Sequence, residues 1–172
     1  ARMAVDFDQK GPYAVVTIDR PEARNAVNGA VAEGIEDAID KIEDDDSIWV
    51  GILTGTPPVF CAGADLKERA SGTPEAQAAG NPMANAMERL AAMDAVTIAA
   101  VDGPVRAGGV GLMAACDLVV VNSTVTFAFT EVRIGVAPAI ISVPILRRVA
   151  PSRIAAAMLT GESFDAHEAR AT

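Results

Sequence analysis

The chain has 172 residues, enough for one domain with a hydrophobic core and short for two. Hydrophobic residues make up 51% and charged residues 22%, an ordinary globular balance that excludes a disordered chain. The formal net charge of -9 argues against a nucleic-acid partner, which would require a basic face, and it leaves any bound phosphate dependent on local Lys or Arg side chains.

The first third of the chain alternates strand and helix patterns. Residues 13–18 (YAVVTI) predict a strand after a Gly-Pro turn, and residues 48–54 (IWVGILT) predict a second one with Trp49 in the core. Between them, four apolar residues at helical spacing predict an amphipathic helix that ends at 44–46: Val31, Ile35, Ile39 and Ile42. This order predicts an α/β fold, and the excess of Ala, Val and Ile suits parallel strands buried on both faces by helices.

The rest of the chain continues this alternation. Residues 68–85 are rich in Gly, Ala, Pro and polar residues and are expected to be mobile. A helix is predicted after them from three apolar residues: Met83, Met87 and Leu90. Further strands are predicted from apolar runs at 96–101, 118–121 and 126–129. The pattern turns helical after Pro138, and Asp165 with Glu168 resembles a capping box. Because this last helix is cut at Thr172, we expect further C-terminal structure that the sequence does not include.

Neither a membrane span nor a cysteine site is indicated. The longest apolar stretch, 134–146, is interrupted by two prolines and falls short of the roughly twenty residues that a span requires. No signal-peptide pattern opens the chain, so we expect a cytoplasmic location. Cys61 and Cys116 lack metal-ligand and disulfide spacing, which predicts buried free thiols and no metal site.

Two loops consist of residues too small to cover their own backbone, Ala62-Gly63-Ala64 and Ala107-Gly108-Gly109, and each follows an apolar strand-like run. A helix that begins after such a loop leaves unpaired N–H groups. Two such loops facing each other would form an oxyanion hole for a carbonyl oxygen that gains negative charge. Taken singly, each loop is also explained by a tight turn, and the second lacks the G-x-G-x-x-G spacing of a dinucleotide site.

Five blocks of sequence occur in a fixed order across nearly the whole chain: 20–26 (RPEARNA), 60–67 (FCAGADLK), 99–117 with its AAVDG, GG and ACD elements, 130–135 (TEVRIG) and 159–161 (LTG). Together they resemble the enoyl-CoA hydratase/isomerase (crotonase) family. The resemblance implies a ClpP-like α/β spiral of ββα units in one core domain over residues 1–172. It also implies assembly into homotrimers or dimers of trimers through C-terminal helices.

The resemblance assigns site residues to positions in this sequence. It implies that the backbone amides of Ala64 and Gly108 form the oxyanion hole, and that the enzyme is a lyase on acyl-CoA. Coenzyme A would be part of the substrate rather than a permanently bound cofactor, with no nucleic-acid or membrane partner. The residues implied to contact it are Arg24, Ala62, Ala64, Asp65, Leu66, Lys67 and Gly108, with Arg24 and Lys67 as the candidates for its phosphates. Either cation could equally be a solvated surface side chain.

Glu131 is the candidate catalytic carboxylate, at the position of a glutamate in many family members. Its apolar neighbours are expected to bury it and raise its pKa, which suits proton transfer. The alternative is a structural carboxylate held by Arg133.

The sequence departs from the family pattern at Gly111, where hydratases carry a second glutamate. With Glu131 alone, hydration would require one group to activate water and then deliver a proton, whereas isomerisation requires only one base. Three functions therefore remain open: an enoyl-CoA hydratase, an enoyl-CoA isomerase and a non-catalytic acyl-CoA-binding homologue. A dinucleotide-dependent oxidoreductase is the alternative from a different class of enzyme.

Overall fold

The structure, a computed structural model, describes residues 3–71 and 81–172. A five-stranded sheet has the order β1-β2-β3-β4-β6, and only the β1–β2 pair is antiparallel. Its strands are β1 (Val5–Lys10), β2 (Tyr13–Ile18), β3 (Val50–Gly55), β4 (Val96–Val101) and β6 (Leu118–Val121). This confirms the strands that the sequence predicts here, and adds β1.

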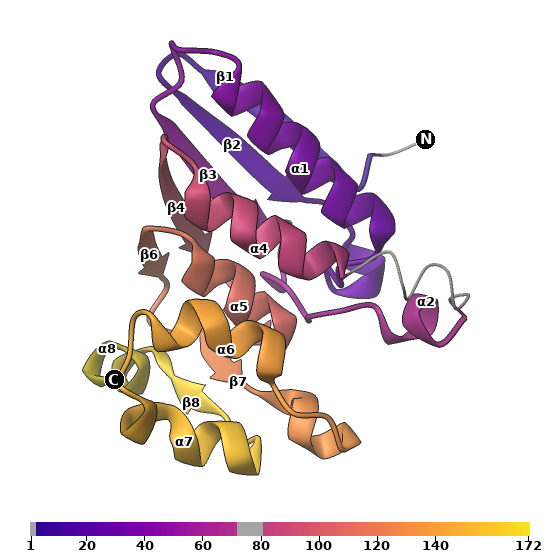
Figure 1. The fold of residues 1–172 in the computed structure, drawn as a ribbon, viewed down its shortest axis with the longest axis vertical. Helices are drawn as coiled ribbons and strands as arrows, with labels where there is room; N and C mark the ends of the chain where they lie inside the picture. Colours follow the sequence, from indigo (N-terminus) through magenta and orange to yellow (C-terminus); the bar gives the residue numbers. More distant parts are fainter. Residues whose placement is uncertain (1–2, 72–80) are drawn as a thin grey trace.

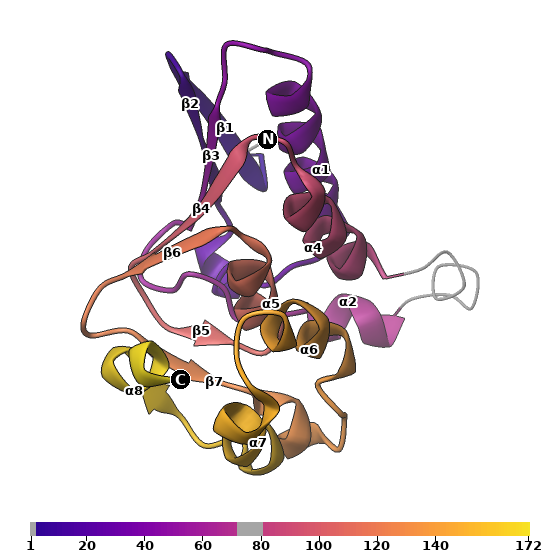
Figure 2. The ribbon, with the colours of Figure 1, turned by 60° about the vertical axis from the view of Figure 1, so that its left-hand side comes forward.

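Three helices lie against one face of this sheet, with α1 and α4 side by side in both views (Figures 1 and 2). They are α1 (Gly29–Glu43), α4 (Pro82–Ala92) and α5 (Gly108–Ala115). The four apolar residues that predict α1 are all buried, and three of them, Ile35, Ile39 and Ile42, line a small internal cavity together with residues of the sheet such as Val16 and Leu53. Asn28 caps the helix, because its side chain accepts a hydrogen bond from the Val31 amide at 3.0 Å.

The opposite face of the sheet corrects the expectation of strands buried on both sides. Burial alternates along β2 and β4, and outward residues such as Val96, Leu118 and Val120 are exposed. Among the described elements, helices pack on one face only (Figure 2). Trp49 precedes β3 and is 69% exposed, so the prediction that it belongs to the core is wrong. An alternating strand buries one face and needs a cover on that face alone.

The second half of the chain forms a small sheet with the order β5-β7-β8, below the large one in Figure 2. Its strands are β5 (Val105–Arg106), β7 (Thr126–Ala128) and β8 (Phe164–Asp165). The helices here are α6 (Ala139–Leu146), α7 (Pro151–Thr160) and α8 (Ala166–Ala171). Two 3₁₀ turns occur in the described residues, η1 (Pro21–Ala23) and η2 (Thr130–Ile134). The predicted capping box is confirmed at the start of α8.

The stretch 68–85, which the sequence predicts to be mobile, has helical residues at both ends. Helix α2 spans Leu66–Ser71 and α4 begins at Pro82, where Asn81 caps it by accepting hydrogen bonds from Met83 and Ala84. The middle of the stretch, 72–80, lies outside the described residues. None of the helices in the described part of the chain is long and apolar enough to cross a membrane.

Candidate active site

Three parallel segments end at one place and supply the candidate groups. Cys61 pairs with Val105 in an isolated parallel bridge, and Val105 pairs with Phe127 between β5 and β7. Ala64, Gly108 and Glu131 follow these three paired residues towards the carboxyl ends of their segments. Ligand sites in α/β proteins form where the carboxyl ends of parallel strands meet, so the topology places the two loops and the carboxylate at one edge.

The peptide between Gly63 and Ala64 has a fixed orientation. Its carbonyl oxygen, on Gly63, accepts a hydrogen bond from the Val27 amide at 2.8 Å, and the next amide, of Asp65, donates to the Val27 carbonyl at 2.8 Å. The C=O and N–H of a trans peptide point in opposite directions. The Ala64 N–H therefore points away from Val27. Gly63 has φ +95°, a conformation that favours glycine.

The second loop runs straight into the first turn of α5. Ala107 donates to the Ala128 carbonyl at 2.9 Å and Arg106 donates to the Cys61 carbonyl at 3.0 Å, which ties the loop to both neighbouring segments. Ala107 itself has φ +47°, a strained value for a residue with a side chain. Gly108 is the first residue of the helix, where backbone N–H groups have no intrahelical acceptor.

The two loops touch, and glycine makes their contact possible. A methyl group built on Gly63 would lie 3.0 Å from the Gly108 nitrogen, and one built on Gly108 would lie 3.5 Å from the Ala64 nitrogen. Neither the Ala64 nor the Gly108 amide donates a hydrogen bond to any residue in the described parts of the chain. The site therefore holds two adjacent backbone donors without an acceptor, the arrangement that binds an oxyanion.

Glu131 lies in η2, immediately after β7, and its side chain is half-buried. Its Oε2 atom is buried and has no hydrogen-bond partner among the described residues. Burial raises the pKa of Glu131 above its ordinary value of 4.5. Arg133 does not hold this carboxylate: the two side chains form no ion pair or hydrogen bond with each other, and Nη2 of Arg133 donates to the Gly161 carbonyl at 2.7 Å. A half-buried carboxyl with an unpaired oxygen is suited to carry a proton between two positions on a bound molecule.

The position of Gly111 on α5 is closed to a side chain. A methyl group built there would lie 2.6 Å from Cε of Met87 on α4 and 2.8 Å from Cγ2 of Ile141 on α6. Two neighbouring helices thus fill the space that a second carboxylate would require. Sequence reasoning identified the missing glutamate but could not identify the side chains that replace it.

The candidate CoA contacts differ in their surroundings. Arg24 and Lys67 are exposed, and the side chain of neither forms a hydrogen bond or ion pair with a described residue. Leu66 is exposed, Ala62 and Ala64 are half-buried, and the Ala62 amide donates to the Arg24 carbonyl at 3.1 Å, which brings Arg24 beside the first loop. Asp65 is different, because its carboxylate already forms an ion pair with Arg20 at 2.8 Å. Sequence reasoning missed Arg20, although it opens the RPEARNA block.

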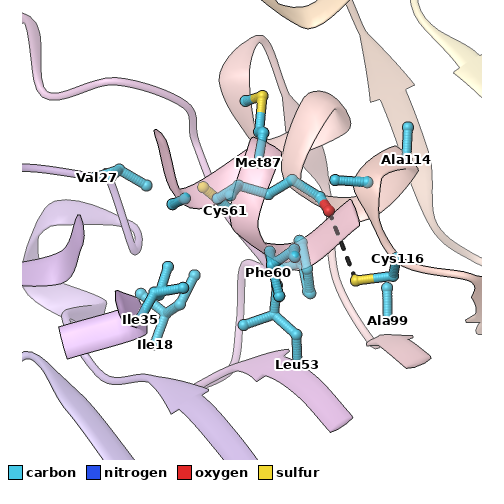
Figure 3. Close-up of a cluster of buried hydrophobic side chains, with 14 of the residues drawn as sticks. Ile18, Val27, Ile35, Leu53, Phe60, Cys61, Met87, Ala99, Ala114 and Cys116 are labelled. Atoms are coloured by element: carbon cyan, nitrogen blue, oxygen red, sulfur yellow. Dashed lines mark hydrogen bonds between the residues drawn. The ribbon is translucent and has the colours of Figure 1, made fainter. Parts of the chain in front are cut away.

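The cysteines are buried free thiols, as predicted. Burial raises the pKa of each to about 12, so neither supplies a thiolate. Figure 3 shows Cys61 with Phe60 and Met87 in a buried hydrophobic cluster that also contains Cys116. The Sγ atom of Cys116 donates to the Leu112 carbonyl at 3.6 Å. Within residues 3–71 and 81–172, no group of three or more His, Cys, Asp or Glu side chains is placed to hold a metal ion.

Comparisons with known proteins agree on one family. The model of the family described as enoyl-CoA hydratase/isomerase matches residues 8–172. A Thermus thermophilus protein, provisionally assigned as an enoyl-CoA hydratase, is 37% identical over 95% of this chain and 66% of its own length. The mevalonyl-coenzyme A hydratase of Aspergillus fumigatus is 38% identical over 90% of this chain and 58% of its own length.

Solved structures show the same fold. The enoyl-CoA hydratase of Mycobacterium tuberculosis superimposes with a TM-score of 0.88 at 33% identity, over 99% of this chain and 66% of that one. This chain therefore spans between about half and two thirds of the length of the relatives that it matches.

Proposed function

The chain belongs to the enoyl-CoA hydratase/isomerase family, and on that premise we propose that it acts on enoyl-CoA thioesters. The observation that carries the proposal is the pair of adjacent backbone amides, Ala64 and Gly108, without acceptors in the described structure. The thioester carbonyl oxygen accepts from both, which stabilises the negative charge that develops on it when a proton leaves or water adds.

Glu131 moves the proton in this proposal. With its pKa raised by burial, the carboxyl exchanges a proton more readily near neutral pH than an exposed glutamate does. In hydration of a 2-enoyl thioester, Glu131 takes a proton from water as the oxygen adds at C3, and the same proton then goes to C2. The enolate oxygen remains held by the two amides between these steps, and the thioester bond stays intact.

The packing at Gly111 favours a second candidate, isomerisation of a 3-enoyl thioester. Here Glu131 removes a proton from C2 and returns it to C4, while the double bond moves into conjugation with the carbonyl. This reaction uses one carboxylate and no water. Met87 and Ile141 occupy the space of a second carboxylate, which is consistent with a single-base reaction.

Candidate CoA contacts complete the proposal. Arg24 and Lys67, exposed beside the first loop, would attract the phosphates of CoA in a protein of net charge -9, and the small residues Ala62 and Ala64 would let the pantetheine approach the backbone. CoA enters and leaves with the substrate, so no permanently bound cofactor is required.

The test is the Glu131→Gln variant, assayed with a panel of 2-enoyl and 3-enoyl-CoA substrates. Removing a general acid–base costs about 10²- to 10⁴-fold in kcat, and we expect a loss in this range while the affinity for CoA is retained. Glu88→Gln is the control, because Glu88 is an exposed carboxylate on α4. The preferred wild-type substrate separates hydratase from isomerase. Turnover of every substrate unchanged in Glu131→Gln would contradict the catalytic role, and acyl-CoA binding without turnover in the wild type would indicate a non-catalytic homologue.

A further inference from the structure

Arg20 and Asp65 connect the two segments that orient the Ala64 amide. One nitrogen of Arg20, Nη1, donates to the Ala26 carbonyl at 2.9 Å and to Asp65 Oδ2 at 2.8 Å. Ala26 and Asp65 are the immediate neighbours of Val27 and Ala64, whose bridge sets the direction of the Ala64 N–H. A single guanidinium therefore links both sides of that bridge.

The link is shielded from solvent and anchored. The Arg20 and Asp65 side chains are only 22% and 12% exposed, unlike a typical surface pair. The Arg20 amide donates to Asn25 Oδ1 at 2.9 Å, and the fully buried Asn25 side chain donates to the carbonyls of Thr56 and Val59. These bonds connect Arg20 to the stretch that leads into the first loop, so its position is fixed independently of Asp65.

Asp65 divides its two oxygens between two tasks. Oδ2 pairs with Arg20, whereas Oδ1 accepts from the amides of Lys67 at 3.0 Å and Glu68 at 3.3 Å at the start of α2. The Arg20 hydrogen bond holds the pKa of Asp65 below its ordinary value, so the carboxylate is charged at neutral pH. Both oxygens are occupied within the protein, which argues against the expectation that this side chain contacts CoA.

We propose that Arg20 and Asp65 are positioning residues, which hold the Val27–Ala64 bridge in register and so aim the Ala64 amide at the thioester oxygen. The inference rests on the proposed function. Without the ion pair, the Val27–Ala64 bridge can shift, and an oxyanion donor displaced by a fraction of an ångström stabilises the developing charge less.

Asp65→Asn tests the ion pair with Arg20 separately from the hydrogen bonds that Asp65 accepts at the start of α2. Asparagine retains an oxygen for the α2 amides, but its amide group cannot accept from Arg20. Arg20→Lys retains the positive charge and loses the planar guanidinium, so its loss of activity should be smaller than that of Asp65→Asn. Asp40→Asn is the matched control, because Asp40 also pairs with an arginine, Arg89, at 2.6 Å, in the link between α1 and α4.

Two measurements distinguish positioning from CoA binding and from a purely structural role. The first is the separation of kcat from KM, and the second is the infrared stretching frequency of a ¹³C-labelled thioester carbonyl in a bound, unreactive saturated acyl-CoA. We expect kcat to fall at least about tenfold in Asp65→Asn with little change in KM, and the carbonyl frequency to rise towards its value in water, because one donor is misplaced.

Each outcome has one reading. A raised KM with unchanged kcat and carbonyl frequency would make Asp65 a CoA contact and overturn the positioning role, and so would variants that match Asp40→Asn in all three quantities. If Asp65→Asn fails to fold, Arg20→Lys decides by the same three quantities. A wild-type protein that neither turns over enoyl-CoA nor shifts the carbonyl frequency would instead overturn the proposed function itself.

Discussion

At the scale of single residues, the site contains two features that lower the stability of the fold, a buried unpaired oxygen and a strained backbone angle. Glu131 leaves Oε2 without a partner among the described residues, and Ala107 has a positive φ that a side chain disfavours. Both lie at the strand ends where the two amides meet. A fold optimised for stability alone would pair the carboxyl and place glycine at the turn, so these two residues point to a functional constraint.

The stability of the protein should depend on pH through Glu131. Burial raises its folded pKa above the ordinary value of 4.5 that it has in the unfolded chain, so the protonated form is favoured in the folded state. The resulting stabilisation is fully present below the unfolded pKa and is lost as the pH rises through the folded pKa. Glu131→Gln does not titrate, so the melting temperature of the wild type should fall relative to that of Glu131→Gln as the pH rises from the unfolded pKa through the folded pKa.

Thermal melts across this range measure the difference. Glu162→Gln is the matched control, because it removes an exposed carboxylate from the adjacent end of α7. A Glu131→Gln difference that stays constant with pH, or that shrinks as pH rises, would show that burial does not disfavour the ionised carboxyl.

At the scale of elements, the packing of α4 and α6 on α5 determines what the site can contain. Met83 and Met87 lie one turn apart on α4 and face Gly108 and Gly111 of α5, and Ile141 of α6 also faces Gly111. The glycines let the helices approach closely, and flexible methionines fill the remaining space. The same contact that stabilises the helices therefore excludes a side chain from position 111.

Gly111→Ala should destabilise the fold through this contact. The new methyl group would lie 2.8 Å from Cγ2 of Ile141, a β-branched side chain with little freedom, and 2.6 Å from the flexible end of Met87. Overpacking of this kind costs about 1–3 kcal/mol, which exceeds the gain of up to about 1 kcal/mol from replacing a helical glycine by alanine. Adding Met87→Ala should recover part of the loss, although Ile141 remains in contact. Gly29→Ala is the control, because a methyl group there would meet its nearest neighbour at 3.7 Å, an ordinary contact. Denaturant unfolding measures the three variants and the wild type, and a Gly111→Ala variant at least as stable as Gly29→Ala would refute the close packing.

At the scale of the whole molecule, the charge distribution constrains how the proposed ligand, CoA, could bind. The net charge of -9 repels a polyanion, so the attraction must come from a few local cations. Arg24 and Lys67 are exposed near the first loop, and neither has an ion-pair partner in the described regions. Arg24 adjoins the first loop through the Ala62 amide, and Lys67 follows Ala64 by three residues, which makes these two cations the candidate phosphate contacts under the proposed function.

If CoA binds the folded protein, it should raise the free energy of unfolding by an amount set by its concentration relative to Kd. A ligand at 100 times its Kd contributes about 2.7 kcal/mol to the free energy of unfolding, which raises the melting temperature by several degrees. We expect the shift with CoA to shrink in the double variant Arg24→Ala, Lys67→Ala. Arg153→Ala removes an exposed cation from α7 and should retain the full shift. A double variant with the wild-type shift would exclude both residues as phosphate contacts.

The sequence by itself determined the family, the α/β class and the elements with strong periodicity. The spacing of Val31, Ile35, Ile39 and Ile42 defines α1, because a helix repeats every 3.6 residues and buries one face. The two small-residue loops were also evident, since only small side chains leave a backbone accessible. These features depend on local chemistry, which the sequence contains in full.

Only the tertiary structure decided which segments meet. The pairing of Cys61 with Val105 and of Val105 with Phe127 joins positions far apart in the chain, and no local pattern specifies that register. The filling of position 111, the exposure of Trp49 and the Arg20–Asp65 pair depend in the same way on neighbours from distant segments. Side-chain packing and strand register are properties of the assembled elements. The direction of the Ala64 amide therefore follows from the tertiary structure and not from the sequence.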